Sequence, residues 1–140
     1  MTRNSPCILL IDDNEHGLAA RRNILEGEGY AVEVACCGQD GVDRFEGGSF
    51  DLVVTDFRMP DLNGPEVIDR IRQTAPGVPI VLLSGYASLL GLTESDTGAD
   101  IVLAKGPTEQ NELLRAIGSL MRRRPSSDNV AAQRHKAATA

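Results

Sequence analysis

The sequence lacks any long apolar run. Its longest apolar stretches, such as residues 7–11 and 80–83, are far shorter than the roughly 20 residues that a helix needs to span a bilayer. A signal-peptide pattern is missing too, because Arg3 is followed by only a short apolar stretch that ends at Asp12 and Asp13. We therefore expect a cytoplasmic protein that does not enter a membrane.

Cysteine and histidine are also scarce. Cys7, Cys36 and Cys37 lack metal-ligand spacing and two of them are adjacent, which argues against a disulfide framework or a zinc site. We expect them to be small buried residues, as free cysteine commonly is. His16 and His135 lie far apart in polar surroundings, and we expect both to face solvent.

The chain is long enough, at 140 residues, for one domain with a real core. Its net charge of −6 is uneven, because residues 122–140 carry five basic side chains and one acidic side chain, which leaves −10 on residues 1–121. An acidic body lacks the basic face that phosphate contacts need, so we expect the domain itself to bind no nucleic acid. We expect residues 122–140 to be a basic, disordered tail or linker stub, with a contact to nucleic acid or membrane as the alternative.

Five short apolar segments recur along the chain, at residues 8–11, 31–35, 52–54, 80–83 and 101–104. Longer stretches with helical spacing separate them, an alternation typical of βα units on a parallel sheet. The apolar segments are continuous, as in strands that are covered by helices on both faces. The pattern predicts an α/β fold, a (βα)5 doubly wound sandwich with a five-stranded parallel sheet.

Four of the intervening helices have a clear apolar stripe. The last is the clearest, with Leu113, Ile117 and Leu120 on one face and a start near Pro107 and Thr108. The segment between residues 87 and 97 is rich in serine, glycine and threonine, which are poor helix formers. It predicts a short or mobile fourth helix.

Polar side chains follow four of the predicted strands. They are Asp12 and Asp13 after the first strand, Asp56 at the third, Ser84 at the fourth and Lys105 at the fifth. Any one of them alone could be a helix cap, a turn residue or a solvated lysine. In doubly wound sheets, however, ligands bind beyond the carboxyl ends of the strands, so the conjunction predicts a site.

Three carboxylates at one partly buried edge repel one another, so such a site should bind a cation or raise a pKa. Lys105 supplies one positive charge and leaves about two negative charges uncompensated. Ligands that are all oxygen favour a hard ion such as Mg²⁺, which keeps several waters and also binds phosphate oxygens. The sequence therefore predicts a Mg²⁺ site that is open to a phosphoryl group.

Four stretches carry these residues: "ILLIDDNE", "DLVVTDFRMPDLNGPEVI", "IVLLSGYA" and "GADIVLAKGP". In their order and spacing, the chain resembles the response-regulator receiver domain of two-component signalling, the CheY-like family, over residues 5–121. The resemblance implies a flavodoxin-like fold, Mg²⁺ dependence and phosphorylation of an aspartate. It also implies a sensor histidine kinase or histidine phosphotransfer protein as donor and a downstream protein as partner.

The resemblance assigns roles to the residues at the strand ends. Asp56 matches the phospho-acceptor, Asp13 the direct metal ligand and Asp12 the ligand that acts through water. The backbone carbonyl of Arg58 matches the third protein ligand. Such a domain is a signalling module, not a conventional enzyme, and catalyses only its own phosphorylation and dephosphorylation.

The remaining matched residues belong to the phosphoryl group and the switch. By the resemblance, Lys105 pairs with the phosphoryl oxygens and Ser84 donates a hydrogen bond to one of them. A charge-assisted bond of this kind should draw Ser84 inward and change the surface made by the fourth helix, the fifth strand and the fifth helix.

Several positions depart from the family pattern. Val102 stands where the family usually has an aromatic switch residue, so the rotation of an aromatic ring is not carried over. Gly106 follows the lysine in place of the usual proline, and a cis peptide there would cost roughly 2.5 to 4 kcal/mol, with a trans peptide as the alternative. Arg58 and Tyr86 lie beside the path of attacking water in the family, which predicts slow loss of the phosphoryl group.

Three alternatives stay open at this stage. The departures favour a phosphate-independent binding module with the receiver fold, which the complete set of strand-end residues opposes. A phosphatase that uses Asp56 as nucleophile would need a second catalytic aspartate two positions on, where this chain has Arg58. The chain could also be a receiver excised from a longer protein.

Overall fold

The fold is a single parallel sheet between two layers of helices, in a computed structural model that describes residues 5–85 and 97–123. Five strands lie in the order β2-β1-β3-β4-β5. Their bounds are Cys7–Ile11 (β1), Ala31–Ala35 (β2), Leu52–Asp56 (β3), Ile80–Ser84 (β4) and Ile101–Ala104 (β5). The predicted five-stranded doubly wound sandwich is confirmed.

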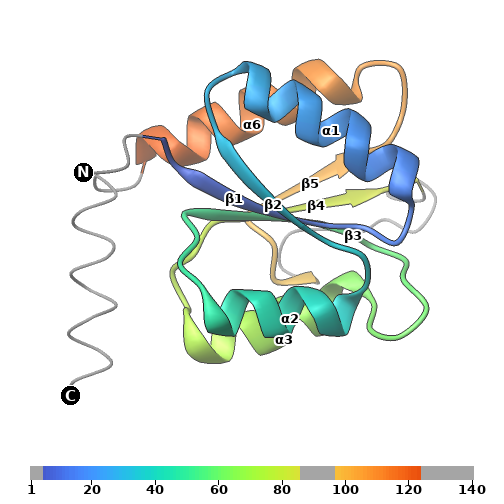
Figure 1. Cartoon of the computed structure of the whole chain (residues 1–140), viewed down its shortest axis with the longest axis vertical. Coiled ribbons are helices and arrows are strands. Elements are labelled where there is room, and N and C mark those ends of the chain that lie inside the picture. Colours follow the sequence, from blue (N-terminus) through green and yellow to red (C-terminus); the bar gives the residue numbers. More distant parts are fainter. Residues whose placement is uncertain (1–4, 86–96, 124–140) are drawn as a thin grey trace.

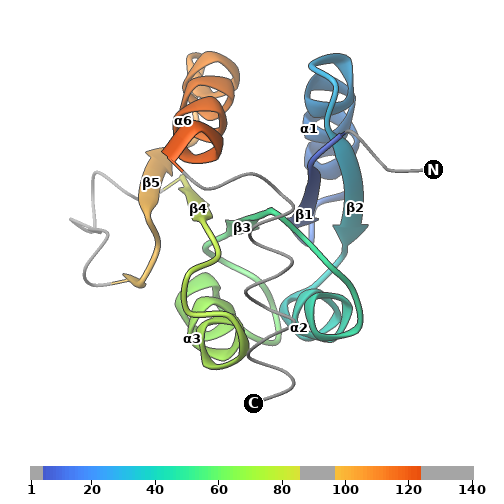
Figure 2. The same cartoon turned by 90° about the vertical axis from the view of Figure 1, so that its left-hand side faces the viewer.

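Helices cover both faces of the sheet (Figure 1). Those among the described residues are Glu15–Gly27 (α1), Gly38–Gly47 (α2), Gly64–Thr74 (α3) and Glu109–Arg123 (α6). Figure 2 shows α1 and α6 on one face and α2 and α3 on the other. The predicted fourth helix, Tyr86, His135 and nearly all of the predicted tail lie outside the described residues.

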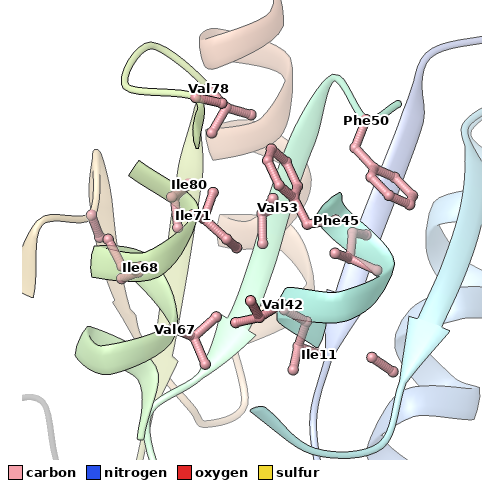
Figure 3. Packing of buried hydrophobic residues seen from close by; sticks show 14 of the residues in the cluster. Ile11, Val42, Phe45, Phe50, Val53, Val67, Ile68, Ile71, Val78 and Ile80 are labelled. Carbon is pink, nitrogen blue, oxygen red and sulfur yellow. The ribbon is translucent and has the colours of Figure 1, made fainter. Parts of the chain in front are cut away.

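Two apolar cores fill the space between the sheet and the helices. The core beneath α2 and α3 contains the residues labelled in Figure 3, among them Phe45, Phe50, Val53 and Ile71. The core beneath α1 and α6 contains Leu10, Leu25, Val81, Leu113 and Ile117, among others. Because side chains alternate along a strand, successive residues of β1, β3 and β4 enter opposite cores.

Burial differs between the central and the edge strands. All residues of β1, β3 and β4 are buried, as their continuous apolar sequences predict. The expectation of full burial is wrong for β2 and β5, in which Glu33 and Ala104 are exposed. These two strands lie at the edges of the sheet, where each has a strand neighbour on one side only among the described residues.

Local sequence signals explain where two helices begin. The side chain of Asn14 accepts a hydrogen bond from Gly17 N at the start of α1. Asn63 and Glu66 form a reciprocal capping box at the start of α3, where Pro65 adds a favourable first-turn residue. These caps begin each helix immediately after a strand-end segment and so place α1 and α3 beside the carboxyl edge of the sheet.

The cysteines follow the sequence expectation only in part. Cys7 is buried in β1, but Cys36 is exposed and Cys37 is half-buried, and all three are free thiols. The prediction of three buried cysteines is wrong because residues 36 and 37 have left the sheet, and Cys37 is the N-cap of α2. His16 is exposed, as predicted.

The backbone after the lysine is now defined. No cis peptide occurs in the part of the chain that the structure describes, so the bond between Lys105 and Gly106 is trans.

Within residues 5–85 and 97–123, no helix is long and apolar enough to cross a membrane.

The start of α2 is capped by a residue from another segment. Asp61, in the loop between β3 and α3, accepts hydrogen bonds from the backbone N–H groups of Gly38 (3.0 Å) and Gln39 (2.8 Å). Its slight desolvation raises the pKa of Asp61, but bonds from the N–H groups of Gln39, Leu62 and Gly38 outweigh this and lower the pKa to about 2. The loop that follows the third strand is thereby tied to α2.

Replacing Asp61 with alanine should lower the free energy of unfolding by about 1 kcal/mol near neutral pH, the usual cost of losing an N-cap. The folded pKa of about 2 lies below the value of about 3.9 in an unfolded chain. The stabilisation is therefore fully present above the unfolded pKa and is lost as the pH falls through the folded pKa. Urea unfolding of both proteins at a series of pH values measures this.

The difference between the wild type and Asp61→Ala should shrink as the pH falls from about 5 toward 2. A difference that stays constant over this range would contradict an ionised cap. Asp69→Ala is the matched control, because Asp69 is an exposed carboxylate on α3 that bonds to the Gln73 amide. It should change stability by less than about 0.5 kcal/mol.

Candidate functional site

The sheet order brings the first and third strands together. Ile11 pairs with Thr55 across β1 and β3, so the next residues of the two strands, Asp12 and Asp56, are neighbours at the carboxyl edge. β2 lies on the other side of β1, which makes the gap between β1 and β3 the point at which the strand order reverses. Ligands bind at such a switch point in doubly wound sheets.

The fourth and fifth strands complete the same edge. Ser84, the last residue of β4, pairs with Ala104, and Lys105 follows directly. The backbone N–H of Lys105 donates to the Ser84 carbonyl at 3.0 Å. Since β4 lies beside β3, Ser84 and Lys105 reach the same edge as Asp56.

Three carboxylates gather here. Asp12, Asp13 and Asp56 each offer an oxygen, and these atoms all lie within 4.8 Å of one another. Asp12 and Asp56 are buried, whereas Asp13 is exposed. The set therefore has a solvent-facing side and a buried side.

Lys105 contacts the buried carboxylates directly. Its Nζ lies 2.6 Å from Asp56 Oδ1 and 4.0 Å from Asp12 Oδ2. Burial raises the pKa of Asp56, the hydrogen bond and charge of Lys105 oppose this, and the charge of Asp12 adds to the increase. The outcome is an Asp56 carboxyl with a pKa above its ordinary value, as in a site that carries an excess of negative charge.

A shallow cavity of about 340 Å³ opens beside these groups. Its lining includes Asp56, Arg58, Ser84 and Lys105. Ser84 is buried and Arg58 is exposed. The cavity gives a small polar group access to Asp56 from the same side as the lysine.

Glycine 64 closes the loop that leaves Asp56. Its N–H donates to the Phe57 carbonyl at 2.8 Å. A Cβ at Gly64 would lie 2.5 Å from Leu82 Cδ1 and 2.8 Å from the Asp56 carbonyl oxygen. The loop can pack this closely on the sheet only because residue 64 has no side chain.

The structure adds two charged residues, Arg21 and Glu109, which the sequence motifs do not reveal. Arg21 on α1 places Nη1 2.7 Å from Asp12 Oδ2 and Nε 2.6 Å from Glu109 Oε2 on α6. Burial lowers the pKa of the Arg21 guanidinium, but its contacts with Glu109 and Asp12 outweigh this effect and raise the pKa overall. Arg21 thus links the acidic cluster to α6.

The periodicity of α1 contains a signal for Arg21. Leu18, Arg21 and Leu25 are the buried residues of this helix and recur with helical spacing. A cation on the buried stripe of a helix requires a buried anionic partner. Asp12 supplies that partner, but the sequence alone does not show that the two meet.

The donor set fits a hard divalent cation. The cluster offers carboxylate oxygens and no nitrogen or sulfur ligand, which suits Mg²⁺. Asp12, Asp13 and Asp56 are the side chains that would hold it. The predicted contribution of the Arg58 backbone carbonyl stays a prediction.

Comparisons with known proteins point to one family. The sequence model described as "Response regulator receiver domain" matches residues 8–118. The response regulator ArlR of Staphylococcus aureus is 33% identical over 127 residues, which are 88% of this chain and 56% of ArlR. The chain therefore spans about half the length of the curated relatives that it matches.

Solved structures give the same result. A crystal structure of a CheY-like response regulator receiver domain protein from Methanospirillum hungatei matches with a TM-score of 0.77 and 30% identity, over 93% of this chain and 99% of that chain. Response regulator protein TrrA from Thermotoga maritima, crystallised in complex with Mg(2+)-BeF, matches with a TM-score of 0.75 and 30% identity. That match covers 82% of this chain and 98% of TrrA.

Proposed function

This chain belongs to the response regulator receiver domain family of two-component signalling, and from that premise we propose that it accepts a phosphoryl group on Asp56. The donor is a phosphohistidine of a sensor histidine kinase or a histidine phosphotransfer protein. The observation that carries the proposal is the direct contact, 2.6 Å, between Lys105 Nζ and an Asp56 carboxylate that lies within a cluster of three. This arrangement gives one nucleophile, one adjacent side-chain cation and a set of oxygens for a metal.

The chemistry needs little more than positioning. An Asp56 oxygen attacks phosphorus in line, the P–N bond to the donor histidine breaks, and the new P–O bond leaves an acyl phosphate on Asp56. Lys105 neutralises negative charge on the phosphoryl oxygens, and Ser84 donates a hydrogen bond to one of them. Mg²⁺, when bound, supplies further neutralisation of those oxygens. Beyond this reaction and the hydrolysis of the acyl phosphate to free Asp56 and inorganic phosphate, the domain is not an enzyme.

The output is a change of surface. The new acceptor draws the Ser84 hydroxyl at the end of β4, which alters the surface around β5 and α6. Val102 occupies the position of the usual aromatic, half-buried against the core beneath α2 and α3. The switch in this chain therefore operates through Ser84 without the rotation of an aromatic ring.

The proposal extends to location and partners. Residues 5–121 act in the cytoplasm as the receiver, and the domain itself binds neither nucleic acid nor membrane. A downstream protein reads the altered surface. Residues 122–140 form a basic tail or a linker to another segment, although α6 runs to Arg123 and so includes the first two of them.

Treatment with an acyl phosphate donor tests the proposal. With Mg²⁺, the protein should show a retarded band on a phosphate-affinity gel, and peptide mass spectrometry should place the phosphate on Asp56. Excess EDTA should abolish the band, because the clustered carboxylates need a divalent cation before they can admit a phosphoryl group.

The absence of a Mg²⁺-dependent phosphorylated species would contradict this function and favour a phosphate-independent binding module. Rapid multiple turnover of unrelated phosphoesters would instead indicate a phosphatase. The first outcome is read from the incubation with the acyl phosphate, and the second from a parallel incubation with those phosphoesters.

A further inference from the structure

Arg21 pairs with Asp12, one of the three carboxylates that are predicted to hold Mg²⁺. Its guanidinium lies 2.7 Å from Asp12 Oδ2, and Asp12 Oδ1 accepts a hydrogen bond from the backbone N–H of Asn14 at 3.0 Å. Both oxygens of this buried carboxylate therefore have donors. A protein cation already lies against one of the groups predicted to hold Mg²⁺.

We propose that Arg21 is a built-in counter-cation that lowers the Mg²⁺ affinity of this receiver, and that Glu109 sets how strongly it does so. The proposal rests on the Mg²⁺ site of the proposed function and adds two residues that tune it. Neither residue contacts the phosphoryl group in this proposal. They act on the metal through Asp12.

The charge of Arg21 is felt strongly because water is largely excluded. The side chains of Arg21 and Asp12 are 10% and 2% exposed, so solvent and salt screen the pair far less than a surface pair. A guanidinium keeps its charge at all accessible pH values. Any divalent cation that approaches Asp12 therefore meets a fixed positive charge.

Lys105 is not the fixed positive charge that opposes a divalent cation at Asp12. Its Nζ is 4.0 Å from Asp12 Oδ2 but 2.6 Å from Asp56 Oδ1, and its side chain is 30% exposed. Lys105 can therefore turn toward an arriving phosphoryl group. Arg21 is held by two carboxylates from two other elements and has no such freedom.

Glu109 is a second anionic partner of Arg21, beside Asp12, and partly neutralises its charge. Its Oε2 accepts from Arg21 Nε at 2.6 Å, while Nη1 serves Asp12. Removal of the Glu109 charge would leave the whole guanidinium charge facing Asp12. The two residues should therefore have opposite effects on metal affinity, although both belong to the same ion-pair network.

Gly17, one helical turn earlier on α1, leaves room for the Arg21 guanidinium. A Cβ at residue 17 would lie 2.9 Å from Arg21 Nη1 and 3.2 Å from Asp12 Oδ2. The missing side chain leaves the space through which the guanidinium reaches the carboxylate. The helix thus has room for this ion pair at residue 17.

Isothermal titration with Mg²⁺ alone, without any phosphodonor, tests the proposal. Arg21→Met keeps the bulk of the side chain and removes its charge, and it should tighten Mg²⁺ binding by roughly tenfold or more, because even in bulk water one unit charge at short range is worth about this much. Glu109→Gln should weaken binding about threefold. In the Arg21→Met background the Glu109→Gln effect should largely disappear, because it acts through Arg21.

Arg22→Met is the matched control. It removes the same charge from the neighbouring residue of α1, but Arg22 is exposed and pairs with Glu26. Its Mg²⁺ affinity should stay within about twofold of the wild type. A change equal to that of Arg21→Met would show that net charge alone is responsible and would overturn the proposal.

Thermal unfolding with EDTA and with Mg²⁺ gives a second readout. Arg21→Met should melt at a lower temperature than the wild type in EDTA, because Asp12 has lost its partner, and should gain more from Mg²⁺. Weaker Mg²⁺ binding by Arg21→Met, or equal changes of the same sign in both single variants, would mean that Arg21 merely positions Asp12. Both outcomes contradict the proposal.

Failure of this inference is distinguishable from failure of the proposed function. If wild type and variants bind Mg²⁺ alike and are all phosphorylated on Asp56, the function stands and the tuning by Arg21 is wrong. If Arg21→Met fails to fold, Glu109→Gln alone decides, because weaker binding supports the inference and unchanged or tighter binding refutes it.

Discussion

Asp56→Asn should abolish phosphorylation by an acyl phosphate in the presence of Mg²⁺. The amide has the shape of the carboxylate but no anionic oxygen to attack phosphorus, so the acyl phosphate cannot form. Among residues 5–85 and 97–123, no other carboxylate combines a position at the end of β3 with a 2.6 Å contact to Lys105. The loss should therefore be complete, measured as the missing band on a phosphate-affinity gel after prolonged incubation.

Asp69→Asn is the control for this substitution. Asp69 is an exposed carboxylate on α3, away from the carboxyl edge, and its replacement should leave the phosphorylation rate unchanged. Circular dichroism should show that Asp56→Asn keeps the fold, because the substitution conserves volume. A full-strength band from folded Asp56→Asn would show that another residue is the acceptor.

Lys105→Met should slow phosphorylation roughly 100-fold or more at saturating Mg²⁺. Lys105 is the side-chain cation in direct contact with Asp56, and the removal of one positioned charge or donor from a transferring group typically costs this much. The variant should still bind Mg²⁺, and at least as tightly as the wild type, because a competing cation is gone. The time course of phosphorylation and a Mg²⁺ titration measure the two effects separately.

The decisive result for Lys105→Met is a slower phosphorylation rate without a loss of Mg²⁺ affinity. If both fell together, the lysine would act by holding the carboxylates in place and not by neutralising the phosphoryl oxygens. Arg115→Met, an exposed cation on α6, removes the same charge elsewhere and should change neither quantity. A rate within about threefold of the wild type would contradict the role of Lys105.

Lys105→Met and Arg21→Met also distinguish the two cations of the site. Both substitutions should leave Mg²⁺ binding at least as tight as in the wild type, but only Lys105→Met should slow phosphorylation at saturating Mg²⁺. Lys105 contacts Asp56, whereas Arg21 contacts Asp12 and Glu109. On the two proposals, Lys105 serves the phosphoryl group and Arg21 tunes the metal site at the same edge of the sheet.

The strands and most of the site were predictable because they depend on local patterns. Continuous apolar runs form β1, β3 and β4, and in a parallel sheet the residues that follow such runs must meet at one edge. That reasoning places Asp12, Asp56, Ser84 and Lys105 together, and the structure does so too. The edge strands were predicted less well, since their order in the sheet decides their exposure.

The residues that escaped prediction are those whose partners come from distant segments. Arg21 and Glu109 are 88 positions apart, and Asp61 caps a helix more than 20 positions earlier. Hydrophobic periodicity marks Arg21 as buried but does not identify its partners. Cys36 and Cys37 were placed in the core from the tendency of their residue type, although the chain leaves the sheet at that point.

The sequence by itself therefore determined the fold class, the five strands and the set of polar residues that meet at the carboxyl edge, because apolar periodicity and strand-end residues can be read within short stretches. Only the tertiary structure decided which charges share that site. Ion pairs such as Asp12 with Arg21 form where α1 and α6 pack on one face of the sheet, and the geometry of that packing is a property of the whole fold. The predicted metal affinity of this receiver depends on those pairs.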